Sequence, residues 1–289
     1  MMHSSVWKID QQQLEVISDI DIITKKFSVP YLLIGAVARD LIVDALGIGR
    51  PRLTYDIDLA VLINGWEEYE RLAEIVLESG RFRQDNVPKH RFIHLAANVP
   101  VDIIPFGPIE EADHIIKWPA PDHTSMSTLG FEDAYNNSIS VTISDKPKII
   151  IRVASRPGFA IMKLIAWNDN RSKQIADALD LLHLIRNYLD SDNLIRLYDE
   201  HSDIATTKDF DYECAGAMLL GRDIAFIASP QTLKAIDDIL VNETSDDSNF
   251  KLISDMLGNA LDREFQSEQL LQLLSCLRNG IQTNKNDVS

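Results

Sequence analysis

Residues Ile34–Asp58 read IGAVARDLIVDALGIGRPRLTYDID, and the predicted fold is organised around this stretch. The apolar residues 31–34 predict a short buried strand, and Gly35 after them permits a sharp turn. The residues 36–46 predict a helix, whose N-terminal N–H groups would favour phosphate binding. A second apolar strand follows the stretch directly. We therefore expect strand, glycine turn, helix and strand, with Gly35 and Ala36 as candidates for phosphate contact.

Two carboxylates, Asp56 and Asp58, stand at the entrance of that second strand. Residues two apart in a strand share a face, and adjacent carboxylates repel each other unless a cation lies between them. Oxygen ligands of this kind suit Mg²⁺. Asp102 lies between Val101 and Ile103 in another apolar stretch, where a buried charge requires a cationic partner. We expect these three aspartates to be metal ligands and catalytic residues.

The order Gly35-Ala36, Asp56-Ile57-Asp58 and Asp102 resembles the signature of the DNA polymerase β-like nucleotidyltransferase superfamily. Its members carry Gly-Gly or Gly-Ser after a strand, then Asp-x-Asp or Asp-x-Glu, then a lone acid on a neighbouring strand. Ala36 departs from that pattern and removes a hydroxyl contact to phosphate. The resemblance implies a Mg²⁺-dependent enzyme that transfers NMP from an NTP to an acceptor hydroxyl.

Three further residues are candidates for nucleotide binding. The pair Arg39-Asp40 in the motif GAVARD resembles a motif in the head domain of tRNA CCA-adding enzymes. The further arginine-rich motifs of those enzymes do not follow it in this sequence. Arg52 lies four residues before Asp56, and Thr54 lies just before the carboxylates. We expect Arg39, Arg52 and Thr54 to contribute to the nucleotide site.

A second motif is the string KLIAWNDNRSKQIADALDLLHLIRNY, residues 163–188. It resembles the helix pair that follows the catalytic domain in AbiEii/AbiGii-type nucleotidyltransferase toxins. The resemblance implies that Lys163 binds the triphosphate and that Asp177 or Asp180 supports catalysis. The alternative is a solvated helix face: Lys173, Asp177 and Asp180 fall on one stripe and would pair with each other, opposite an apolar stripe that includes Leu179.

Composition limits the classes of protein. The chain has 289 residues, of which 45% are hydrophobic, enough for two domains with their own cores. Its formal net charge of −16 argues against broad nonspecific binding of nucleic acid. The basic residues of 81–91 are the exception, and they are the expected contact if the acceptor is RNA.

Localisation and redox state are also predicted. Only Cys214 and Cys276 occur, far apart and without zinc-ligand spacing, so we expect buried thiols and no disulfide. The N-terminus has no basic run followed by an apolar one, and no window of 18 apolar residues follows. These patterns predict a cytoplasmic protein without membrane contact.

The hydrophobic period changes near residue 154. Before it, helices and strands are mixed, which predicts an α/β (α+β) nucleotidyltransferase domain with a mixed sheet over 1–154. After it, helical periodicity predicts an all-helical domain over 155–289, with a frayed tail from Gly280. Strands at 92–96 and 101–106 predict a hairpin that places Asp102 on the strand next to that of Asp56 and Asp58, or one strand further.

Three functional classes stay open at this point. The AbiEii-like resemblance implies the toxin of a toxin–antitoxin pair, with an NTP as substrate, tRNA or another RNA as acceptor, an antitoxin as partner and an active site between the two domains. A small-molecule transferase of the aminoglycoside or lincosamide type is the alternative within the same chemistry. A nucleotide-binding regulatory protein with degraded catalysis is the third, favoured by Ala36 and opposed by the three retained carboxylates.

Overall fold

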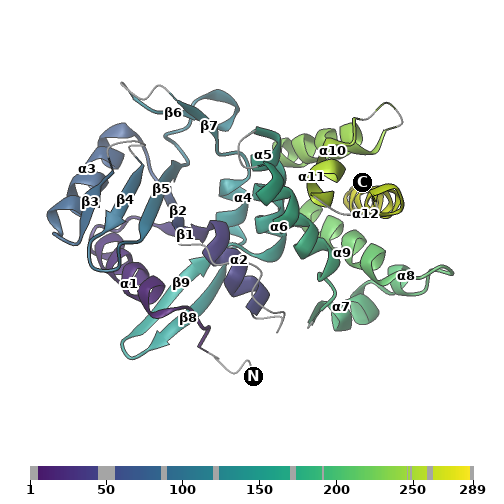
Figure 1. Cartoon of the computed structure of the whole chain (residues 1–289), viewed down its shortest axis with the longest axis horizontal. Helices are drawn as coiled ribbons and strands as arrows, with labels where there is room; N and C mark the ends of the chain where they lie inside the picture. The colour runs from purple at the N-terminus through teal and green to yellow at the C-terminus, as the bar shows by residue number, and fades with distance from the viewer. Residues whose placement is uncertain are drawn as a thin grey trace. The chain divides into compact units, whose positions relative to one another are not determined.

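The structure is a computed structural model. It describes residues 6–44, 56–85, 90–119, 124–169, 174–190, 192–245, 247, 249–258 and 263–286. The chain divides into two compact units, Met1–Ser155 and Arg156–Ser289. The first contains a mixed sheet with helices, and the second is helical (Figure 1), so the predicted fold class is confirmed.

A seven-stranded mixed sheet is the framework of the first unit, in the order β3-β4-β5-β2-β1-β9-β8. The β1/β9 and β2/β5 pairs are parallel, and the other neighbours are antiparallel. The central strands are buried almost throughout, as their apolar sequences require. The strands are β1 Tyr31–Ile34, β2 Ile57–Leu62, β3 Phe82–Gln84, β4 Arg91–His94, β5 Pro100–Phe106, β8 Ile139–Asp145 and β9 Lys148–Val153.

The longer helices described in the first unit are α1, α2 and α3. The helix α1, Gln11–Lys26, begins with a capping box in which the Asp10 side chain accepts from the backbone N–H of Gln13. The helix α2, Gly35–Asp44, starts directly at the end of β1, and α3 spans Trp66–Glu78.

The region 108–137 lies outside the seven-stranded sheet. It does contain the short strands β6, Ile115–Lys117, and β7, Ser125–Ser127, which form a separate two-stranded sheet after a single 3₁₀ turn, η1 Ala112–His114. It also contains a helix that the sequence pattern did not predict, α4 Phe131–Asn136. At six residues, α4 is too short to show a helical period.

The pairing of β4 with β5 confirms the predicted hairpin, and β5 then pairs in parallel with β2. Asp102 therefore lies on the strand directly beside that of Asp58. One row of the ladder runs across three strands, because Arg91 faces Asp102 and Asp102 faces Asp58. Residues in such a row present their side chains on the same face of the sheet.

The second unit consists of helices packed on one another. The helix α5 begins at Arg156. The helices are α5 Arg156–Asp169, α6 Gln174–Arg186, α7 Asp192–Glu200, α8 Ser202–Ala205, α9 Tyr212–Ile227, α10 Pro230–Thr244, α11 Lys251–Leu257 and α12 Arg263–Asn286.

The contact between α9 and α12 overturns two expectations. Cys214 on α9 and Cys276 on α12 form a disulfide, with their Cα atoms 5.5 Å apart, so the prediction of buried thiols was wrong. Sequence distance concealed the pair, because only the helix packing brings the two cysteines together. The expected frayed tail from Gly280 was also wrong: α12 continues to Asn286, and Ile281 within it is fully buried.

Glycines explain how closely α9 and α12 approach. A methyl group built on Gly221 would lie 2.8 Å from the backbone nitrogen of Ile281 and 3.0 Å from the Cα of Gly280. A methyl group on Gly280 would in turn overlap the backbone of Met218. The two helices therefore touch backbone to backbone, an approach that only glycine allows.

Candidate active site

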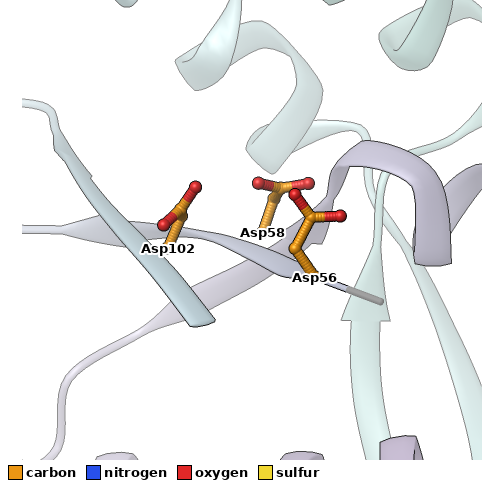
Figure 2. A group of neighbouring side chains, drawn as sticks. All are labelled: Asp56, Asp58 and Asp102. Carbon is orange, nitrogen blue, oxygen red and sulfur yellow. The ribbon is translucent and has the colours of Figure 1, made fainter. Parts of the chain in front are cut away.

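Three aspartates gather on one face of the sheet. Oxygen atoms of Asp56, Asp58 and Asp102 lie within 4.8 Å of one another, and Figure 2 shows the three side chains on the same side of their strands. Asp56 immediately precedes β2, Asp58 lies within it, and Asp102 faces Asp58 from the parallel strand β5. Asp102 is buried, whereas Asp56 and Asp58 are half-buried. The strands therefore place three oxygen donors where one divalent cation can be shared.

Gly35 makes room for the second of these carboxylates. It follows Ile34, the ladder partner of Asp58, and its φ of +68° lies in the region that favours glycine. A Cβ atom at position 35 would overlap Oδ2 of Asp58 and lie 2.7 Å from its Cγ. The glycine was predicted for a turn and a phosphate contact. The structure adds that the carboxylate of Asp58 lies against its Cα.

The cationic partner expected for Asp102 is Arg91. Its Nε donates to Oδ1 of Asp102 at 2.7 Å and its Nη2 donates to Oδ2 at 2.6 Å, which is the bidentate geometry of a strong charge-assisted pair. The same Nη2 lies 4.0 Å from Oδ2 of Asp56. Sequence reasoning had assigned Arg91 to a basic RNA-binding segment. The predicted hairpin began its first strand at residue 92 and so left Arg91 out, and only the observed register places it opposite Asp102.

Aromatic side chains pack behind the strand that carries Asp102. The hydroxyl of Tyr69 donates to the carbonyl of Ile103 at 2.9 Å, and its ring contacts Trp66 and Trp118. Burial, and then the negative charge of Asp102, raise the pKa of Tyr69 well above its ordinary value. Tyr69 therefore stays a neutral hydrogen-bond donor and fixes β5 beside the carboxylates.

A family model decides the classification of this chain. The model of the family described as "Nucleotidyl transferase AbiEii toxin, Type IV TA system" matches residues 45–270. The chain belongs to this family. It is a nucleotidyltransferase, and the resemblance inferred from its motifs is confirmed.

Solved nucleotidyltransferases are similar to the chain at low sequence identity. The antibiotic-resistance factor ANT(2'')-Ia is 16% identical, over 68% of this chain and 97% of that one, with a TM-score of 0.37. The lincomycin-bound lincosamide antibiotic adenylyltransferase LnuA is 16% identical, over 60% of this chain and 96% of that one, with a TM-score of 0.35. The Thermotoga maritima CCA-adding enzyme, complexed with tRNA, is 11% identical, over 95% of this chain and 82% of that one, with a TM-score of 0.25. No curated protein sequence gives a match.

The AbiEii-type motif of the second unit forms a buried charge cluster. Lys163 on α5 lies 2.8 Å from Oδ1 of Asp177 and 2.8 Å from Oδ2 of Asp180, both on α6. Burial lowers the pKa of Lys163, but the two carboxylates outweigh it and raise the pKa above its ordinary value. The motif residues are thus brought together. Their roles in NTP binding and catalysis stay predictions.

The alternative interpretation of α6, a solvated and self-paired charged face, does not describe Asp177 and Asp180. Asp177 is 8% exposed and faces Lys163, whereas Ile175 and Leu179 on the apolar stripe are 55% and 41% exposed. The buried side of the helix therefore includes its acidic stripe. Lys173 lies outside the described residues, so its expected pairing is not addressed.

The remaining candidates for nucleotide binding have different surroundings. Arg39 is 6% exposed, and its guanidinium donates to Oδ1 of Asp40 at 2.9 and 2.7 Å. Ala36 lies in the first turn of α2, as expected. Arg52 and Thr54 lie outside the described residues. A nucleotide-binding role for these four residues stays a prediction.

The basic segment 81–91 is less available than its sequence indicates. Arg81 pairs with the buried Asp19 on α1, and Arg91 pairs with Asp102. Arg83 is exposed on β3, and Lys89 lies outside the described residues. Two of the arginines of this segment are therefore engaged in ion pairs within the first unit, and its role as an RNA contact stays a prediction.

Membrane-spanning segments were searched among the described helices. None of them combines the length and the hydropathy that crossing a bilayer requires.

Proposed function

We propose that this chain transfers a nucleoside monophosphate from an NTP to an acceptor hydroxyl with the help of Mg²⁺, and that the unit Met1–Ser155 is its catalytic domain. The observation that carries the proposal is the cluster of three carboxylates within 4.8 Å on adjacent parallel strands. An all-oxygen donor set of this kind fits Mg²⁺, which also retains water and phosphate ligands. Membership of a nucleotidyltransferase family supports the reaction class.

The aspartates have separate tasks in this proposal. Asp56 and Asp58 hold the metal ion, and Asp102 completes its ligand shell and accepts the proton of the acceptor hydroxyl. When bound, Mg²⁺ supplies electrophilic stabilisation of the attacking and leaving oxygens. Both strands are largely buried within the sheet, which holds the carboxylates in place before the reaction.

Phosphate binding is assigned to the junction of β1 and α2. Gly35 opens a helix of ten residues, whose first N–H groups have no partner within the helix. Those groups favour an anion at the N-terminus, beside Asp58. Arg39, Arg52 and Thr54 are proposed to support the nucleotide there, and Lys163, held by Asp177 and Asp180, is proposed to bind its triphosphate.

The test is nucleotide transfer with α-labelled NTPs, supplied one at a time with cellular RNA or with small acceptors. Asp58→Asn should abolish transfer while circular dichroism shows the wild-type fold. Asp10→Asn serves as a matched control, because Asp10 caps α1 and is not part of the cluster. Transfer at the wild-type rate by Asp58→Asn would contradict the proposed mechanism.

For the acceptor, we propose tRNA, with the chain acting as the toxin of a toxin–antitoxin pair that an antitoxin partner opposes. The family description supports the toxin role. Because the chain carries a net charge of −16, RNA contact must be confined to small basic areas, and Arg83 is an exposed candidate.

Arg83→Glu tests this acceptor. It should weaken transfer to RNA and reduce its salt dependence, since fewer phosphate contacts release fewer counterions. Lys234→Glu makes the same change of charge on the exposed face of α10 and should have little effect. Unchanged transfer and salt slope in Arg83→Glu would remove this hairpin as the RNA contact. Labelling of a small acceptor in place of RNA would instead identify a small-molecule transferase.

A further inference from the structure

Arg91 is placed inside the carboxylate cluster by the register of the sheet. It is the direct partner of Asp102 between β4 and β5, and its guanidinium engages both carboxylate oxygens of that residue. Its Nη2 also approaches Oδ2 of Asp56 to 4.0 Å. The guanidinium therefore lies between two of the three carboxylates that would ligate a metal ion.

The charges show what the arginine does in the metal-free protein. Its side chain is only 28% exposed and that of Asp102 is 6% exposed, so the pair has little help from solvent. The hydrogen bonds to Asp102 raise the pKa of Arg91 far above its ordinary value, and the charges of Asp102, Asp56 and Asp58 add to this effect. One fixed positive charge thus stabilises the whole cluster.

A divalent cation bound by Asp56 and Asp102 would meet this guanidinium at close range. Like charges at such a distance repel strongly in a site that is partly shielded from water. Arg91 occupies one acceptor site on each carboxylate oxygen of Asp102, so a metal ion shared with Asp56 would have to use the remaining sites beside the guanidinium. The two cations therefore cannot both make their best contacts with Asp102.

We propose that Arg91 is a resident counter-cation that competes with the catalytic metal ion for Asp102 and Asp56, and that it must leave this position before the metal-bound site forms. This inference rests on the proposed function, since it concerns the same carboxylates. It gives the site two states. In one, Arg91 neutralises the cluster; in the other, the metal ion does so, and the arginine is released toward solvent or substrate phosphate.

The contrasting role is that of a positioning residue, in which Arg91 keeps its bond to Asp102 and orients that carboxylate for the metal ion. The two roles predict opposite changes in metal-ion affinity when Arg91 is replaced. Removal of a competitor tightens metal binding, whereas removal of a positioning residue weakens it. The intrinsic affinity for a metal ion, without nucleotide and without turnover, separates them.

The experiment measures Mn²⁺ binding to the full chain by the electron paramagnetic resonance signal of free Mn²⁺. Arg91→Gln should bind Mn²⁺ on the order of tenfold more tightly than the wild type, the effect of losing one competing charge. Arg91→Lys, which keeps the charge but not the two parallel N–H donors, should lie between them. Arg71→Gln, an exposed arginine on α3, is the matched control and should bind as the wild type does.

Thermal unfolding gives a second readout. Without metal, Arg91→Gln leaves the buried Asp102 uncompensated, so Mn²⁺ should raise its unfolding temperature more than it raises that of the wild type. If Arg91→Gln does not fold without metal, Arg91→Lys decides alone. Equal or weaker Mn²⁺ binding by the Arg91 variants would overturn the competition.

Failure of the proposed function is distinguishable from failure of this inference. If Asp58→Asn binds Mn²⁺ as well as the wild type does, the carboxylates are not the metal site and both ideas fail. If Asp58→Asn loses Mn²⁺ but the Arg91 variants do not gain it, only the competition is wrong.

Discussion

The Cα of Gly35 lies directly against the carboxylate of Asp58. The backbone at position 35 has φ of +68°, and a methyl group added there would overlap that carboxylate. The residue that turns the chain from β1 into α2 is therefore also the one that leaves space for a proposed metal ligand. The backbone proposed to bind phosphate and a side chain proposed to bind the metal ion therefore meet at one point in the structure.

Gly35→Ala should consequently abolish nucleotide transfer and lower the free energy of unfolding by ~1–3 kcal/mol, from backbone strain and displacement of Asp58. Gly80→Ala is the matched control, because Gly80 has φ of +69° and open space where its Cβ would be. It bears the same strain without the overlap. If both variants lose equal stability and both retain transfer, the close approach of Gly35 to Asp58 is not required for nucleotide transfer.

Lys163→Met should destabilise the second unit by about 3–5 kcal/mol, since it leaves Asp177 and Asp180 without their shared cation in a buried position. Denaturant unfolding measures the loss. Adding Asp177→Asn and Asp180→Asn to Lys163→Met removes the uncompensated charge and should recover much of it. The free energy of NTP binding, measured by calorimetry, should become less favourable by ~1–3 kcal/mol if Lys163 also contacts phosphate. Unchanged affinity in a folded variant would leave Lys163 with a structural role only.

The buried Asp19 makes a pH-dependent contribution to stability. Burial raises its pKa, but hydrogen bonds from Arg81 and His94 outweigh that effect and leave the pKa below its ordinary value. Nδ1 of His94 accepts from the backbone N–H of Ala97, so its Nε2 donates to Asp19, at 3.0 Å. The stabilisation is therefore fully present above about pH 4, the ordinary pKa of an aspartate.

This contribution should be lost as the pH falls below about 4, toward the lowered pKa of folded Asp19. As the pH is lowered from about 6 to 2, the free energy of unfolding should fall less steeply for Asp19→Asn than for the wild type. Arg81→Gln, which removes one donor, should show an intermediate slope. Parallel curves for all three proteins would show that Asp19 does not titrate in this way.

Gly221→Ala should destabilise the second unit by roughly 2 kcal/mol or more, because its methyl group would meet backbone atoms of α12 that cannot rotate away. Gly216→Ala on the same helix is the control: its nearest neighbour is a Leu189 side-chain atom at 3.3 Å, and alanine favours a helix. A comparison of their unfolding midpoints tests the crossing. Equal midpoints would show that α9 and α12 separate without cost.

Local patterns were sufficient for much of the fold. The spacing of Asp56 and Asp58 predicted a shared face, and the hairpin of 92–106 predicted that Asp102 would lie near them. Apolar patterns predicted the strand of residues 31–34, the helix that follows Gly35 and the helical character of the chain after residue 154. These features depend on residues close in sequence, or on a single short turn, so local sequence patterns are enough to predict them.

Long-range pairing explains what the sequence concealed. The disulfide joins residues 62 positions apart, and its formation depends on how α9 and α12 pack. Asp177 is buried and Asp180 half-buried on α6 because Lys163 on α5 faces both, which the sequence of α6 alone cannot reveal. Arg91 likewise looked like a surface charge until the register placed it opposite Asp102.

The row Arg91, Asp102 and Asp58 has a consequence for insertions and deletions. Side chains alternate along a strand, so adding or removing one residue within β4 after Arg91, or within β5 before Asp102, would turn one of these two side chains to the other face of the sheet unless a bulge absorbed the change. A change of two residues would restore its face. A change in the length of the turn after β4 leaves both faces unchanged, because hairpin loops occur in odd and even lengths, so the positions where this spacing matters lie within β4 and β5 themselves.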